Sequence, residues 1–184
     1  ADFGPNIVGV AASAGKGYTK GIDISIQKKL SQYGLYGMIN YSYINSGFTA
    51  LAGNEKPGAF DPGNSFTLIA GYQFKNGWLL GAKLKYSGGR PYTPISITES
   101  EQVNRAVFAT DDFNSARYPY YVRIDMRVDK KFDFSKASLV CYIELQNLFD
   151  RENIYSYYWN EDNKKPGTIY QWAFFPVGGI SIQF

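Results

Sequence analysis

The chain contains no histidine and only one cysteine, Cys141, among its 184 residues. This composition argues against a disulfide framework and against most transition-metal and Cys–His catalytic sites, which depend on these two residue types. Charged residues amount to only 19%, the formal net charge is +3, and basic residues are spread over the chain among acidic ones. A nucleic-acid-binding protein would concentrate its basic residues in a patch or stripe. We therefore expect no cofactor, no metal and no nucleic-acid partner.

A long hydrophobic run is also missing, since no stretch reaches the roughly 18 apolar residues of a transmembrane helix. The mean hydropathy is slightly negative, as in a soluble protein. A membrane barrel is still compatible with these values, because alternation along a β-strand halves its apparent hydrophobicity. Aromatic residues, by contrast, are abundant at 17%, with 16 Tyr and 13 Phe.

The stretch from Tyr120 to Phe149 has the clearest pattern. Between residues 122 and 129, every even position is apolar and every odd position is charged. A period of two is typical of a β-strand, whereas a helix would scatter the charges over two sides. Alternation resumes after a short turn at 133–136, and we expect this second strand to continue through 147–150 towards 155–159. The stretch predicts a hairpin with an apolar face and an ionic face, belonging either to a soluble sandwich or to an outer-membrane barrel.

The lengths of the connections discriminate between these two folds. Alternating segments predict seven strands, and a weak eighth is expected at 7–14. The connections are alternately short, at 31–33, 75–77 and 133–136, and long, at 45–64, 88–119 and 160–167. Strands that cross a membrane up and down have short periplasmic turns and long outer loops, whereas sandwiches follow no such rule. We therefore predict an all-β fold, an antiparallel up-and-down transmembrane β-barrel with about eight strands in this chain.

At the positions of the predicted strands that alternate with the polar ones, aromatic residues gather near the strand ends, whereas the strand middles hold Ile, Leu, Ala and Gly. We call these alternate positions the apolar parity. This distribution predicts interfacial girdles, although aromatic residues are also good strand formers. The expected girdle residues are Tyr41, Tyr43, Tyr72, Phe74, Trp78, Tyr86 and Phe132. Cys141 also has the apolar parity, and we expect it to be a small buried or lipid-facing hydrophobe.

The charged parity predicts an ionic network that faces the barrel lumen. Its expected members are Asp23, Lys83, Lys85, Arg123, Asp125, Arg127, Asp129 and Glu144. Paired carboxylates such as Asp125 and Asp129 suit acid–base chemistry, but the interleaved arginines favour a structural ion network. No nucleophile–base pair, phosphate loop or metal spacing appears, so we predict no catalytic residue and no enzyme activity. No ligand-binding residue is assigned, because loop recognition has no transferable motif.

The last strand ends in an aromatic residue, Phe184, with Ile182 on the same face and Gly179 five residues before the end. This pattern resembles the C-terminal insertion signal of bacterial outer-membrane proteins, which the barrel-assembly machinery reads by edge pairing. Val177 departs from the pattern, because a polar residue is usual at that position.

Several elements together resemble the C-terminal end of a TonB-dependent receptor. They are the run 123–132 (RIDMRVDKKF), a short turn, an alternating strand, the sequence NLFD at 147–150 and the terminal Phe strand. The sequence GYTKGID at 17–23 also resembles a strand opening of those barrels, so the resemblance covers roughly residues 17–184. It implies a location in the bacterial outer membrane, with the lipid bilayer and the barrel-assembly machinery as partners. The family further implies a 22-stranded barrel, an N-terminal plug and an energy-coupling box for the TonB complex.

Neither plug nor box occurs in this chain, and about eight strands are too few for the 22-stranded barrel. We favour a C-terminal piece of a larger receptor, and a complete small barrel sharing its last strands is the alternative. Residues 1–184 would form a single barrel segment, with 1–16 poorly defined and no signal-peptide pattern at a mature or truncated start.

Three functional hypotheses follow from this fold. The first is active uptake of a scarce nutrient, such as an iron chelate, cobalamin, a glycan or a peptide. The second is a stand-alone structural or adhesive outer-membrane barrel. The third is an outer-membrane enzyme, which is the weakest because such enzymes generally need histidine.

Overall fold

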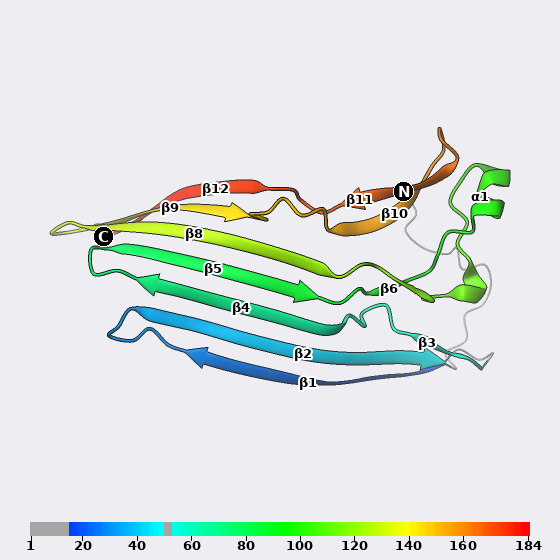
Figure 1. The fold of residues 1–184 in the computed structure, drawn as a ribbon, viewed down its shortest axis with the longest axis horizontal. Coiled ribbons are helices and arrows are strands. Elements are labelled where there is room, and N and C mark those ends of the chain that lie inside the picture. The colour runs from blue at the N-terminus through cyan, green and yellow to red at the C-terminus, as the bar shows by residue number, and fades with distance from the viewer. Residues whose placement is uncertain (1–14, 50–52) are drawn as a thin grey trace.

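The computed structural model describes residues 15–49 and 53–184, so the weak strand expected at 7–14 lies outside the described residues. Seven long antiparallel strands pair in the order of the chain, and the predicted all-β antiparallel fold is confirmed (Figure 1). They are β1 (Lys16–Lys28), β2 (Leu35–Thr49), β4 (Gly63–Gln73), β5 (Trp78–Ser87), β8 (Tyr121–Asp133), β9 (Ser138–Gln146) and β12 (Phe175–Gln183). The eighth strand of the sheet, β3 (Glu55–Pro57), is a short addition that pairs with the end of β2.

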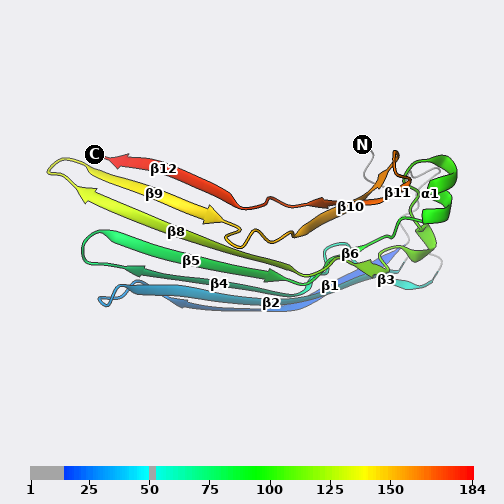
Figure 2. The same cartoon turned by 45° about the horizontal axis from the view of Figure 1, so that its top comes forward.

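The sheet is curved and open. Strands β1, β2 and β4 are spread apart in Figure 1 but lie nearly over one another in Figure 2, as expected of a sheet that curls. Among the described residues, β1 and β12 form the two edges and do not pair with each other. The sheet that the described residues form is therefore not a closed barrel.

All short connections lie at one end of the sheet and all long ones at the other (Figure 1). We call these the turn end, with connections 29–34, 74–77 and 134–137, and the loop end, with connections 50–62, 88–120 and 147–174. At the turn end, Gly77 has a φ of 79°, which suits the tight turn predicted there. The predicted alternation of short and long connections is confirmed.

The loop end contains more regular structure than the sequence predicts. The segment 88–120 holds β6 (Pro91–Tyr92), α1 (Ile97–Val103), the 3-10 turn η1 (Thr110–Asp112) and β7 (Ala116–Arg117), and β6 pairs with β7. A separate hairpin is formed by β10 (Ile154–Asn160) and β11 (Lys165–Tyr170). No helix of the described residues is long and apolar enough to span a membrane.

The prediction that the strand after residue 138 continues towards 155–159 is wrong. Strand β9 ends at Gln146, because Asn147 and Asp150 both adopt left-handed backbone conformations with φ of 50°. Asn and Asp are the non-glycine residues that tolerate this conformation best, and it interrupts the extended backbone. The predicted loop at 160–167 is correspondingly only the tip of the β10–β11 hairpin.

The strand register collects the alternating residues into two continuous faces. One row across five strands reads Ile26, Ile39, Leu68, Leu84 and Ile124. The neighbouring row, on the opposite side, reads Ser25, Asn40, Thr67, Lys85 and Arg123. We call the two sides the apolar face and the ionic face. A slip of one residue in any pairing would mix them, so the sequence pattern itself specifies the register.

The apolar face is uncovered. Ile26, Ile143 and Ile180 are 63%, 62% and 71% exposed, and Trp159 in the β10–β11 hairpin is the one buried large hydrophobic side chain of the described residues. Apart from Pro91, the other buried side chains are polar. They are Ser46, Asp61, Ser100, Asn114, Asp125, Asn147 and Asn153. A soluble protein shows the reverse distribution, with apolar side chains inside and charged ones outside.

Candidate functional site

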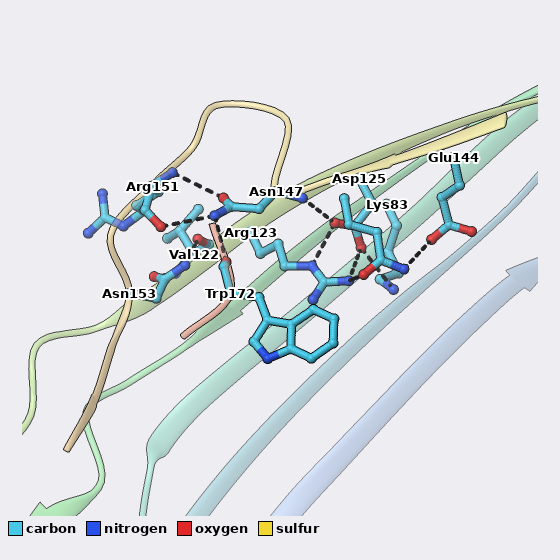
Figure 3. A network of polar contacts seen from close by, with 10 residues as sticks. Lys83, Val122, Arg123, Asp125, Glu144, Asn147, Arg151, Asn153 and Trp172 are labelled. Carbon is cyan, nitrogen blue, oxygen red and sulfur yellow. Dashed lines mark hydrogen bonds and ion pairs between the residues drawn. The ribbon is translucent and has the colours of Figure 1, made fainter. Parts of the chain in front are cut away.

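The ionic face carries its most buried charge at Asp125, which is only 4% exposed. Its Oδ1 accepts hydrogen bonds from Nε of Arg123 at 2.6 Å and from the backbone N–H of Asn147 at 3.0 Å, and its Oδ2 lies 3.1 Å from Nζ of Lys83 (Figure 3). The register explains this cluster, because β5 places Lys83 directly opposite Asp125, and Arg123 precedes Asp125 by two residues on the same face.

A second cluster on the same face centres on Arg127. Its guanidinium lies 2.7 Å from Asp129 and 3.6 Å from Glu144 on β9, and 3.9 Å from the centre of the Tyr142 ring. The ion pairs run both along β8 and across to β9, which is the geometry of cross-strand stabilisation.

Six of the eight predicted network residues therefore form ion pairs with one another. The other two also lie on the ionic face, Asp23 on β1 opposite Ser42 of β2, and Lys85 on β5 opposite Arg123 of β8. They form no ion pair within the described part of the chain. Both Asp125 and Asp129 are paired with an arginine, as a structural ion network requires. The arrangement supports a structural role.

The turn after β9 is held by the side chain of Asn147, which is almost completely buried. Its Nδ2 donates to the backbone oxygens of Arg151 and Trp172, and its Oδ1 accepts from the Arg151 N–H at 3.1 Å. Asp150 accepts from the Phe174 N–H at 2.7 Å, and the Leu148 N–H donates to the carbonyl of Ile124. The NLFD sequence thus ties β8, β9 and the segment before β12 together.

Asn153 continues the sheet beyond the end of β9. Its Oδ1 accepts from the Val122 N–H at 3.0 Å, and its Nδ2 donates to the Val122 carbonyl at 2.8 Å. The side-chain amide therefore takes the place of a neighbouring strand's backbone. Sequence reasoning missed this residue, because a single polar residue between two segments carries no periodic signal.

The loop end contains an aromatic cluster that sequence reasoning also missed. The Tyr118 ring stacks on Tyr92 at 4.3 Å and on Tyr157 at 5.3 Å between ring centres, so three separate segments meet there. Burial raises the pKa of the Tyr92 and Tyr118 phenols above their ordinary value. The guanidinium of Arg90 lies 5.5 Å from the Tyr118 ring and donates to the Tyr155 carbonyl. The aromatic abundance of the sequence is the signal for such a cluster, but it does not indicate which rings meet.

An ion pair between a buried aspartate and a half-exposed arginine joins two of the long connections. Asp61, in the connection 50–62, lies 2.8 Å from Nη2 of Arg117, which belongs to the connection 88–120. Arg117 also donates to the carbonyls of Asp61 and Gly89. These contacts fix the loops relative to each other.

Open hollows lie along the ionic face at both ends of the sheet. One, of about 880 Å³, is at the turn end, where Lys75 and Lys131 line it together with Asp129 and Asp133. Two smaller ones, of about 530 and 440 Å³, adjoin at the loop end and share lining residues. These volumes are in the range of small-molecule sites.

The predicted girdle residues occur at both ends of the apolar face. Four lie towards the turn end and three lie nearer the loop end. The first group is Tyr72, Phe74, Trp78 and Phe132, and the second is Tyr41, Tyr43 and Tyr86. Six of the seven are more than one-third exposed. Lys130 lies on the same face with its Nζ 5.1 Å from the Trp78 ring.

The residues of the predicted C-terminal signal are divided between the faces. Ile182 lies on the apolar face opposite Leu139, and Phe184 is fully exposed. Gly179 lies on the ionic face opposite Tyr142, where a Cβ would come within 2.7 Å of the tyrosine ring. A larger residue there would have to displace the end of the Tyr142 side chain, whatever the part of Gly179 in assembly.

Comparison with known proteins gives no assignment: the chain matches no family model, and no curated protein matches it. The resemblance to TonB-dependent receptors stays a prediction from the sequence motifs.

Proposed function

We propose that this chain is a segment of an outer-membrane β-barrel, the C-terminal part of a TonB-dependent receptor that takes up a scarce nutrient. The observation that carries the proposal is the distribution of side chains between the two faces. An apolar face that extends across seven strands and stays uncovered, opposite a face of ion pairs centred on the buried Asp125, suits a sheet between lipid and a polar lumen.

The aromatic residues support the same placement. Trp78 and Tyr86 are at the two ends of β5, eight residues apart, which corresponds to about 27 Å along the strand. A strand tilted by about 40° would then place them about 20 Å apart in height, close to the thickness of the apolar band of such barrels. Lys130 beside Trp78 suits the membrane–water boundary, because its charge can reach water while its stem remains apolar.

The open edges support a segment of a larger barrel. A closed barrel requires every edge strand to be paired, and β1 and β12 are unpaired within the described residues. Further strands on both sides would complete the ring. The alternative, a stand-alone structural or adhesive barrel, would require β1 and β12 to pair with each other.

Topology on intact cells tests the proposal. A recognition site for a specific protease is inserted between Asp162 and Asn163, in the β10–β11 turn at the loop end. The matched control carries the same insertion between Asn76 and Gly77 at the turn end. We expect cleavage of the first protein by external protease and protection of the second until the outer membrane is permeabilised.

Cleavage only at the turn end, or at neither site in protein extracted from the outer membrane, would contradict the proposed orientation. The mass of the native, unheated barrel distinguishes the alternatives. A mass well above the 20.7 kDa of this chain is expected of a receptor, and a mass near that value would favour the small barrel.

A further inference from the structure

The two adjoining hollows at the loop end form a continuous surface on the ionic face. They share Tyr121, Tyr155 and Gln171, and they lie between the ends of β5 and β8 and the segments that flank β10 and β11. We call this surface the loop-end hollow. On the proposed function, it faces the side from which a nutrient would arrive.

The charged groups of the loop-end hollow are all basic. Lys85, Arg90 and Arg123 line it, and no carboxylate does. Arg123 is neutralised by Asp125, whereas Lys85 and Arg90 form no ion pair within the described residues. The hollow at the turn end differs, because two aspartates accompany its lysines. Uncompensated basic groups in a concave site attract anions.

The remaining lining is dominated by exposed aromatic rings. Trp172 is 72% exposed, and Tyr155 and Tyr170 are about half exposed. Figure 3 shows Trp172 beside Arg123 on the ionic face. Such rings present flat apolar faces on which a planar molecule can stack.

The backbones that carry the Trp172 and Tyr155 rings are held by hydrogen bonds. The Trp172 carbonyl accepts from Asn147, and its ring packs edge-on against Phe175 at 5.1 Å between centres. The backbone of Tyr155 is fixed by Arg90, whose guanidinium also lies 5.7 Å from the Tyr155 ring. A site on a fixed backbone loses less conformational entropy on binding than one on a free loop.

We propose that the loop-end hollow binds a small anionic molecule that carries a flat face, with Lys85 and Arg90 binding the anionic groups and Trp172 and Tyr155 stacking on the ring. This inference rests on the proposed function for its biological sense, and names the class of nutrient. Two sources share the chemistry, an aromatic acid and an acidic sugar.

The test uses the native full-length protein extracted from the outer membrane into a neutral detergent. Binding is measured by calorimetry with three probes: naphthalene disulfonate for the aromatic acid, trigalacturonate for the acidic sugar and maltotriose as the neutral control. We expect at least one anionic probe to bind about tenfold or more tightly than maltotriose, with affinity that falls as salt is added.

Two variants separate the charges from the rings. The double variant Lys85→Gln, Arg90→Gln should lose about tenfold or more in affinity, since charge-assisted hydrogen bonds contribute most strongly. Trp172→Leu should weaken binding while leaving its salt dependence unchanged. The matched control, Lys75→Gln with Lys131→Gln, removes two charges from the turn-end hollow and should bind as the wild type does.

The native state of each variant is checked by its heat-modifiable migration. The inference is overturned if neither anionic probe binds the wild type, if maltotriose binds equally well, or if the Lys85, Arg90 double variant keeps full affinity. The topology experiment is independent of these outcomes. A correctly oriented barrel that binds no anion would leave the proposed function intact and remove only the ligand class.

Discussion

The two faces of the sheet are built from alternate residues of the same strands, yet their environments are opposite. On the ionic face Asp125 is almost fully buried among its partners, whereas on the apolar face Ile143, one strand away, is mostly exposed. The comparison shows that burial in this chain follows polar pairing rather than hydrophobicity, which is suited to a surrounding medium that is itself apolar.

The largest expected effect comes from placing the same charge on each face of one strand. Ile39→Arg puts a guanidinium in the middle of the apolar face and should lower the free energy of unfolding in lipid by about 2–4 kcal/mol. Ser42→Arg, on the ionic face of the same strand, faces Asp23 across the β1–β2 pair and should change it by less than about 1 kcal/mol. Denaturant titration of the protein reconstituted in lipid vesicles measures both. Equal effects would break the distinction between the faces.

A smaller effect is expected from the buried cluster on the ionic face. Asp125→Asn keeps the shape but removes the charge that holds Arg123 and Lys83, and should destabilise the folded protein by about 1–3 kcal/mol. Glu144→Gln is the matched control, because Glu144 is more exposed and lies 3.6 Å from Arg127. It should cost less than about 1 kcal/mol. The same titration applies, and a larger loss in the control would contradict the ranking of the two clusters.

The smallest effect concerns the amide that extends the sheet. Asn153→Ala removes two hydrogen bonds to Val122 and should cost about 1–2 kcal/mol, with faster hydrogen exchange of the Val122 amide. Asn163→Ala, in the exposed turn of the β10–β11 hairpin, is the control and should leave both quantities unchanged. Unaltered exchange at Val122 in the first variant would show that the clamp does not form in solution.

The strands were predictable because apolar and polar residues alternate along them with a period of two. In β8 the alternation from Val122 to Asp129 indicates both the strand and its faces, and pairing with the next strand along the chain places Lys83 opposite Asp125. The ionic clusters were therefore largely accessible from sequence. Whether the sheet closes into a barrel could not be predicted, because closure depends on partners for the two edge strands, β1 and β12.

The loop end was much less predictable. The stacking of Tyr118 on Tyr92 and Tyr157 joins segments that are distant in sequence, and no local pattern records which rings will meet. The left-handed conformation of Asn147 breaks a strand whose side-chain alternation alone favoured continuation. Tertiary contacts decided these features, as they commonly override local preference.

Cys141 lies on β9 between Lys130 of β8 and Ile180 of β12, on the apolar face. Being the only thiol of the chain, it offers a single chemical handle at a position whose surroundings separate the possible media. A spin label attached there would sense dissolved oxygen, which concentrates in hydrocarbon, or a water-soluble nickel complex, which is excluded from it. A spin label on this one natural cysteine would therefore report whether the apolar face contacts hydrocarbon or water, without any engineered cysteine.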